Sequence, residues 1–152
     1  MLAEEIAPAL FHYVVACDAA WTTRSALVEA RRGGTAATLA LEADERRRWW
    51  TGGSEIAAVR GCVDVDLGFT PATNTIAIRR LALDVGRGAE PTAAWVRPDD
   101  LAVLPLAQGY TRLSASTYDY RSESGFTTRL EVDDLGLATS YPPFWARVSP
   151  GG

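Results

Sequence analysis

The chain has 152 residues, of which 47% are hydrophobic and 22% are charged, so it can bury one substantial core. Its formal net charge of −4 argues against a general nucleic-acid binder, which needs a net positive face. We therefore expect a single globular domain over residues 1–152 and no nucleic-acid partner.

The sequence predicts neither a membrane span nor a secretory signal. No run of about 20 apolar residues occurs, and the acidic start, residues 1–5, lacks the basic segment of a signal peptide. We therefore expect a cytoplasmic protein in which Cys17 and Cys62 stay reduced and buried. These two thiols and the one histidine, His12, are too few for a metal site, and we expect no cofactor.

Short segments of alternating or β-branched residues, separated by turn residues, predict an all-β protein. The expected strands cover residues 9–17, 22–30, 35–41, 57–67 with a break at Gly61, 75–83, 92–97, 108–122, 126–132 and 137–141. Turns are expected at residues 31–34 and 70–74, and a loop at residues 84–91. No segment has ten or more residues of apolar helical period, so we expect an antiparallel barrel, roll or sandwich.

A run of charged residues, 44–48, precedes two adjacent tryptophans. The charged run is expected to form a solvated turn. Trp49 and Trp50 are expected to pack in the core or at its rim, and the alternative is that they line a lipid-facing mouth.

Asp64 and Asp66 are two residues apart, so both carboxylates point to one side of the predicted strand. Paired carboxylates suit metal binding, glycoside hydrolysis or the binding of a sugar hydroxyl. The structural alternative is pairing with Arg79 and Arg80 across the turn, where opposite charges on facing strands contribute about 0.2–1 kcal/mol. We favour the structural pairing and keep ligand contact and catalysis as alternatives.

Other catalytic constellations are weak. Cys62 and His12 could act as nucleophile and base only if the fold joins them, and we expect a buried thiol and a core histidine instead. The sequence has no Gly-x-Ser-x-Gly elbow, Walker loop or Gly-x-Gly-x-x-Gly motif.

Aromatic residues are the remaining candidates for a site. Tyr118 and Tyr120 share one face of the predicted strand with Arg112 and two serines. Such a face suits an amphipathic ligand, and it equally suits the solvent face of a sheet.

Several motifs point to a family. They are Gly61-Cys62-Val63-Asp64-Val65-Asp66-Leu67, Thr70-Pro71-Ala72-Thr73-Asn74-Thr75, Ile78-Arg79-Arg80-Leu81, Ala94-Trp95-Val96, Val132-Asp133, Gly136-Leu137 and Tyr141-Pro142. Isolated matches are Tyr13, Asp18, Trp21, Arg24, Gln108, Tyr110, Tyr118, Tyr120 and Trp145. On these residues the chain resembles, over nearly its whole length, a bacterial family of small β proteins named for glycolipid binding.

The resemblance implies an antiparallel β roll or incomplete barrel with little or no helix, and it supplies no catalytic residues. Family members carry a further N-terminal segment before the strand that matches residues 9–17. Loss of that segment would expose a sheet edge, so a homodimer through the N-terminal edge is one expectation.

The prediction is therefore non-enzymatic binding of an amphipathic ligand, a lipid or glycolipid. The predicted ligand-binding residues are Asp64, Asp66, Arg79, Arg80, Trp95, Tyr110, Tyr118 and Tyr120. One alternative is a hydrolase that acts on a sugar or lipid head group through Asp64 and Asp66, and another is a dimeric protein-interaction module.

Overall fold

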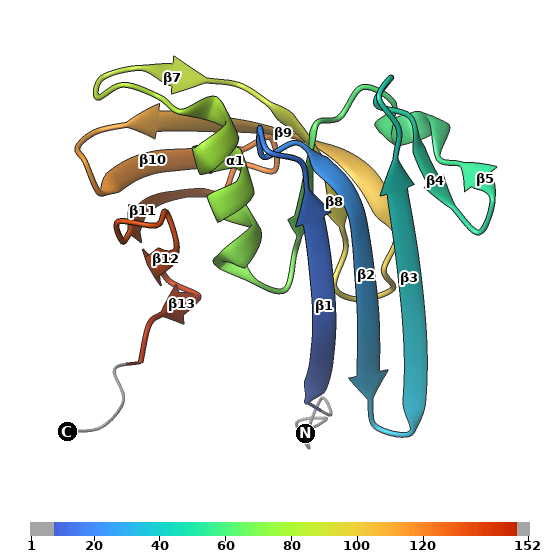
Figure 1. The fold of residues 1–152 in the computed structure, drawn as a ribbon. Helices are drawn as coiled ribbons and strands as arrows, with labels where there is room; N and C mark the ends of the chain where they lie inside the picture. The colour runs from blue at the N-terminus through green and yellow to red at the C-terminus, as the bar shows by residue number, and fades with distance from the viewer. Residues whose placement is uncertain (1–7, 149–152) are drawn as a thin grey trace.

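The computed structural model describes residues 8–148, which form two β-sheets and an α-helix that lies beside them (Figure 1). The acidic start of the chain, residues 1–5, from which we predict no signal peptide, lies outside this range. The prediction of a mostly β fold is confirmed, and the second sheet curls into an incomplete barrel.

The first sheet has five strands that follow one another in chain order. They are β1 (Ala9–Cys17), β2 (Thr23–Arg32), β3 (Thr35–Ala43), β4 (Trp49–Thr51) and β5 (Ser54–Glu55). Every neighbouring pair is antiparallel. The expected hairpin between β2 and β3 is present, and Gly33 supplies the positive φ of 59° that its turn requires.

The second sheet runs in the order β13-β12-β11-β10-β9-β8-β6, and β7 pairs with β9. Its strands are β6 (Asp64–Leu67), β7 (Gly88–Ala89), β8 (Thr92–Val96), β9 (Val103–Arg112), β10 (Thr117–Ser122), β11 (Thr127–Val132), β12 (Ala138–Tyr141) and β13 (Trp145–Ala146). The expectation of a wholly antiparallel fold is wrong at one place, because β6 runs parallel to β8.

The segment predicted as a strand over residues 75–83 is instead the helix α1 (Asn74–Leu81), which follows a 3-10 turn at Pro71–Thr73. Thr70 caps that turn by accepting a hydrogen bond from the Ala72 N–H, and proline occupies its first position. The first five residues of α1 are all buried, so the helix shows no polar face there from which a helical period could be recognised.

Two further strand predictions also need correction. Of the segment expected over residues 57–67, only β6 is a strand, and Ala57–Val59 forms a 3-10 turn. Residues 108–122 form parts of two strands, β9 and β10, and the chain turns between them at residues 113–116. The Arg112 guanidinium stabilises this turn by donating hydrogen bonds to the carbonyls of Ser114 and Ala115, and it also bonds the Leu83 carbonyl. The expected face of Tyr118 and Tyr120 with Arg112 and the serines is therefore divided between two strands and a turn.

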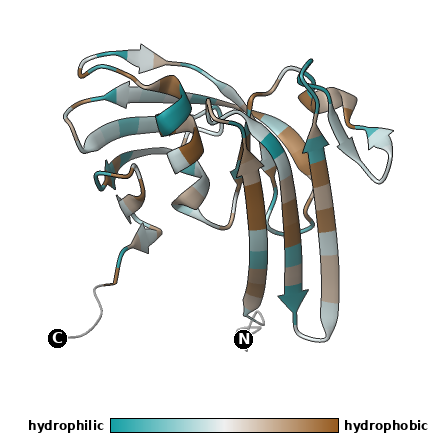
Figure 2. Cartoon of the chain, viewed as in Figure 1, coloured by the Kyte–Doolittle hydropathy of each residue, from teal (hydrophilic) through white to brown (hydrophobic). Residues whose placement is uncertain are grey.

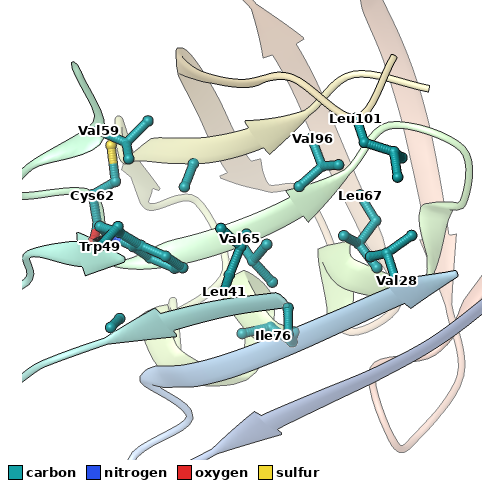
Figure 3. Packing of buried hydrophobic residues seen from close by; sticks show 13 residues of the cluster. Val28, Leu41, Trp49, Val59, Cys62, Val65, Leu67, Ile76, Val96 and Leu101 are labelled. Carbon is teal, nitrogen blue, oxygen red and sulfur yellow. Dashed lines mark hydrogen bonds between the residues drawn. The ribbon is translucent and has the colours of Figure 1, made fainter. Parts of the chain in front are cut away.

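The buried apolar side chains form two clusters. The larger one lies between the first sheet and strands β6 and β8, where Val28 and Leu41 meet Val65, Leu67 and Val96 (Figure 3). The smaller one lies between α1 and strands β9 to β11 and contains Ala77, Ile78, Tyr110, Tyr118, Tyr120, Leu130 and Val132. Ile76 of α1 belongs to the larger cluster, so the helix contributes to both cores.

The charged run before Trp49 is a turn, as expected, but Arg47 in it is half-buried. Its guanidinium donates to the carbonyl oxygens of Thr23 at 2.8 Å, Val63 at 2.5 Å and Cys62 at 3.3 Å. The Trp49 indole N–H donates to the same Cys62 oxygen at 2.8 Å. Arg47 and Trp49 therefore join the first sheet to the segment that leads into β6, and the prediction of core packing for Trp49 is confirmed.

Strand β1 is an edge of the first sheet, and within residues 8–148 it pairs only with β2. Apolar bands run along both strands in Figure 2, and Leu10 and Val14 of β1 are exposed. His12 is exposed on this strand, so the expectation of a core histidine is wrong. Both cysteines are free thiols, and Cys62 is buried as expected, whereas Cys17 is only half-buried. Dimerisation through this edge stays a prediction.

Replacement of Arg47 by methionine tests the role of its guanidinium. Arg47→Met should lower the free energy of unfolding by about 2–4 kcal/mol, because the carbonyls of Thr23 and Val63 lose the guanidinium as a donor. Arg46→Met is the matched control, because Arg46 is exposed in the same turn and should change stability by less than about 0.5 kcal/mol. Urea denaturation measures the stability of both variants. Equal losses of stability would contradict the conclusion that the Arg47 guanidinium joins the first sheet to the segment before β6.

Candidate ligand cavity

A cavity of about 460 Å³ lies between the second sheet and the loop that leads into α1. Its walls come from segments far apart in the sequence, including β6, β8, β10 and β12. The lining residues are Asp66, Leu67, Gly68, Phe69, Thr70, Pro71, Asn74, Trp95, Leu106, Tyr120, Ser122, Ser124, Phe126, Tyr141, Phe144 and Trp145. A volume of this size is typical of sites for small organic molecules, about 300–1,000 Å³.

The polar groups of the cavity converge on Asp66. The side-chain amide of Gln108 donates to Asp66 Oδ2 at 2.5 Å and also to the Tyr120 hydroxyl at 2.9 Å. The Thr73 hydroxyl donates a longer bond of 3.4 Å to Asp66 Oδ1, and the same hydroxyl oxygen accepts from the Leu67 N–H. Gln108 and Tyr120 are buried, so this network forms the inner part of the cavity.

Asp66 has no cationic partner among the described residues. Desolvation raises the pKa of its carboxyl group to about 6, and the hydrogen bonds from Gln108 and Thr73 offset this effect only in part. The nearby charge of Asp64 raises the pKa further. Asp66 therefore changes its protonation state close to neutral pH, which is characteristic of carboxyl groups at functional sites.

Asp64, on the same face of β6, has a different environment. Its two oxygens accept hydrogen bonds from Nε and Nη2 of Arg80, both at 2.7 Å, and its side chain is only 2% exposed. This two-pronged geometry is the strongest form of an arginine–carboxylate pair. The structural pairing of Asp64 with an arginine is thus present, although it joins a strand to a helix rather than two strands of a hairpin.

Aromatic rings extend from the buried network to the rim of the cavity. The Tyr120 ring lies 6.2 Å from Phe126 and 6.0 Å from Tyr141, measured between ring centroids. Phe126 lies 5.5 Å from Phe144, which is 71% exposed. On the opposite wall, Phe69 stacks on Phe11 of β1 with a centroid distance of 4.0 Å. The exposed rim therefore carries aromatic rings beside Ser124, and the buried part combines the polar network with apolar Leu67 and Pro71.

Gly68 shapes one wall of the cavity. A Cβ atom at this position would lie 2.7 Å from the Trp95 indole nitrogen and 3.0 Å from the Val96 carbonyl oxygen. Only glycine allows the loop after β6 to approach β8 this closely. The close approach places the Trp95 side chain along the cavity wall.

The structure brings together only some of the predicted ligand-binding residues. Asp66, Trp95 and Tyr120 line the cavity, whereas Asp64 and Arg80 bond each other. Whether any of these residues binds a ligand stays a prediction.

The other three predicted residues do not line the cavity. Arg79 lies over the Trp21 ring at 4.9 Å and donates to the Leu135 carbonyl. The Tyr110 hydroxyl donates to Asn74 at 2.6 Å, and the Tyr118 ring packs under Arg112. Tyr110 therefore supports the cavity indirectly through Asn74, which is a lining residue.

Sequence reasoning missed Gln108, which bonds Asp66, and several lining residues, notably Phe69, Phe126 and Phe144. The alternation of β9 and β10 places Gln108 beside Tyr120, and pairing of these strands could have indicated that contact. The phenylalanines stand in or beside turns, where periodicity carries no information about which way a side chain points.

Within residues 8–148, no group of three histidine, cysteine or carboxylate side chains could hold a metal ion. The same residues include no helix long and apolar enough to cross a bilayer.

Comparison with known protein families identifies the family of this chain. A family model described as "Putative glycolipid-binding" matches residues 1–147. The chain belongs to this family. A crystal structure of a DUF1089 family protein from Pseudomonas aeruginosa is similar, with a TM-score of 0.89 and 36% sequence identity. That similarity covers 96% of this chain and 81% of the Pseudomonas chain, while a comparison with curated proteins found no match.

Substitution of Arg80 tests whether the buried ion pair is structural. Arg80→Met leaves the Asp64 carboxylate buried without its partner and should lower the free energy of unfolding by about 3–5 kcal/mol. The neighbouring Arg79→Met removes an exposed cation and should cost less than about 1 kcal/mol. Adding Asp64→Asn to Arg80→Met should recover part of the loss, measured by urea denaturation, and no recovery would contradict the pairing argument.

The pKa of Asp66 predicts a pH-dependent stability difference. The folded-state pKa of about 6 exceeds the value of about 4 for an unfolded chain, so the folded state binds the proton more tightly. The resulting stabilisation is complete below about pH 4 and is lost as the pH rises through about 6. Asp66→Asn, which mimics the protonated form, should equal the wild type at about pH 4 and exceed it by about 2–3 kcal/mol at about pH 8.

Chemical denaturation of both proteins at the two pH values measures this difference. Asp99→Asn is the control, because Asp99 is an exposed turn residue outside the cavity. The control should show no pH-dependent difference from the wild type. A constant difference between Asp66→Asn and the wild type at both pH values would contradict the raised pKa.

Proposed function

We propose that the protein binds an amphipathic ligand, a lipid or a glycolipid, in the cavity beside Asp66 without transforming it. The observation that carries the proposal is that one cavity combines a buried polar network with exposed aromatic rings. Tyr120 at the inner end is 4% exposed and takes part in a hydrogen-bond network, while Phe144 at the rim is 71% exposed. A ligand with one polar end and one apolar end is complementary to such a surface.

Two further features support the proposal. The family is named for glycolipid binding, which matches a cavity that combines hydroxyl and carboxylate groups with aromatic rings. Exposed apolar side chains at the rim would contact the ligand or a lipid surface, and either contact removes them from water.

The hydrolase alternative has less support from the geometry. Glycoside hydrolysis by the usual route needs two carboxyl groups that are both free to act on the substrate. Both oxygens of Asp64 are bonded by Arg80, and Asp66 is the one carboxylate among the described residues that line the cavity. The arrangement therefore favours binding over catalysis by this pair.

Native mass spectrometry tests the proposal. The purified protein, mixed with a bacterial lipid extract, should retain lipid, and the masses released on denaturation should correspond to amphipathic molecules. A protein that remains at its apo mass after exposure to the extract would overturn the proposal.

A pair of rim variants locates the binding. Phe144→Asp places a charge on the apolar rim and should reduce the lipid-bound fraction about tenfold, because the carboxylate would be desolvated against the ligand. Leu135→Asp is the matched control, because Leu135 is 62% exposed in a turn outside the cavity and should leave lipid retention unchanged. Equal losses in both variants would place the ligand elsewhere on the protein.

A further inference from the structure

The charges around the cavity constrain the head group of the ligand. The described lining residues include one carboxylate, Asp66, and neither an arginine nor a histidine. Arginines close to the lining residues have other partners. Arg80 bonds Asp64, Arg79 packs on Trp21, and Arg121 pairs with Glu90. A phosphate or carboxylate head group in this cavity would meet a like charge and no cation. Burial of an anion without a partner is strongly unfavourable.

The hydrogen-bonding groups suit an uncharged head group that both donates and accepts. A carboxylate offers about four acceptor positions, and Gln108 and Thr73 occupy two of those on Asp66. The hydroxyls of Thr70, Ser122 and Ser124 also line the cavity. Ser122 and Ser124 bond each other at 2.6 Å, and Thr70 accepts from the Ala72 N–H. Thr70 and one of the two serines therefore keep a free donor, and all three hydroxyls can accept further hydrogen bonds. The hydroxyl groups of a polyol are complementary to this mixture.

The distribution of burial sets the orientation of the ligand. The half-buried Asp66 and the buried Tyr120 line the cavity and are bonded by the buried Gln108 behind them. The exposed rings of Phe144 and Trp145 lie at the rim. A fatty-acid site with its chain innermost would show the opposite order. The ligand that matches this order places its head group inward and its apolar chain toward the rim.

We infer, resting on the function proposed above, that the ligand enters head first and that its head group is an uncharged polyol such as a sugar. Asp66 accepts hydrogen bonds from the hydroxyl groups of this head group. Gln108 acts as a positioning residue, because it holds Asp66 and Tyr120 in one network. A phosphate-bearing lipid and a fatty acid are excluded as preferred ligands, because either would bring an anion to Asp66.

Three amphiphiles with one tail and different head groups test the inference on the wild-type protein. The probes are decyl glucoside, decyl phosphate and decyltrimethylammonium, each below its critical micelle concentration, measured by isothermal titration calorimetry at about pH 7.5. Decyl glucoside should bind at least about tenfold more tightly than either charged probe. Equal or tighter binding of the phosphate or the ammonium probe would overturn the inference while leaving the proposed function intact. Failure of all three probes to bind would count against the proposed function itself.

Variants of Asp66 test whether its carboxylate determines the preference for one head group over another. Asp66→Ala should weaken decyl glucoside binding about tenfold, because an acceptor for the sugar hydroxyls is lost. Asp66→Asn keeps an acceptor but removes the charge, so it should lose less glucoside affinity and gain affinity for decyl phosphate. Asp99→Asn is the control and should leave the ranking of the probes unchanged. An unchanged ranking in Asp66→Asn would show that Asp66 does not select the head group.

A spin label distinguishes the two orientations. A decyl glucoside with a nitroxide at the end of its tail should broaden the backbone amide NMR signals of Phe144 and Trp145 most strongly. Broadening centred on Gln108 and Tyr120 would overturn the head-first orientation.

Discussion

The buried ion pair between Asp64 and Arg80 fixes the position of α1, on which the rest of the structure depends. The helix contributes Ile76 to one core and Ala77 and Ile78 to the other, so a shift of the helix would disturb both. A buried ion pair adds little net stability compared with apolar packing, but an unpaired charge at the same place is very costly. The pair therefore acts mainly by excluding other positions of α1, and the start of α1 supplies Asn74 to the cavity wall.

Much of the β structure could be predicted because strands with one buried face have a period of two. In β3, for example, Leu41 is buried while its neighbour Glu42 is exposed. The helix could not be predicted in this way, because α1 lies between two layers and residues on all its sides are buried at its start. The turn at residues 113–116 was missed because it contains no glycine, proline or asparagine. The parallel pairing of β6 with β8 depends on contacts between distant segments, which no local pattern encodes.

The candidate site could be predicted only in part, for a related reason. The two-residue spacing correctly places Asp64 and Asp66 on one face, because that relation is local to the strand. Local sequence patterns do not determine which of the two arginines faces that strand. Arg79 and Arg80 are adjacent in sequence, yet the turn of the helix directs Arg80 to Asp64 and Arg79 to Trp21. The aromatic rim is assembled from loops and short edge strands, so its members could not be identified before the fold was known.

The two aspartates are the same residue type, and they differ in the partners that surround their carboxylates. Because Arg80 compensates the charge of Asp64, that carboxylate satisfies the usual requirement for a buried ion. Asp66 does not satisfy it, since amide and hydroxyl donors are its partners in a setting that raises its pKa to about 6. A protein that lacked a ligand would be more stable with a neutral side chain at this position. The function proposed above would supply hydrogen-bond donors to this uncompensated charge from the head group of a ligand, which is how the proposal accounts for a carboxylate without a cationic partner.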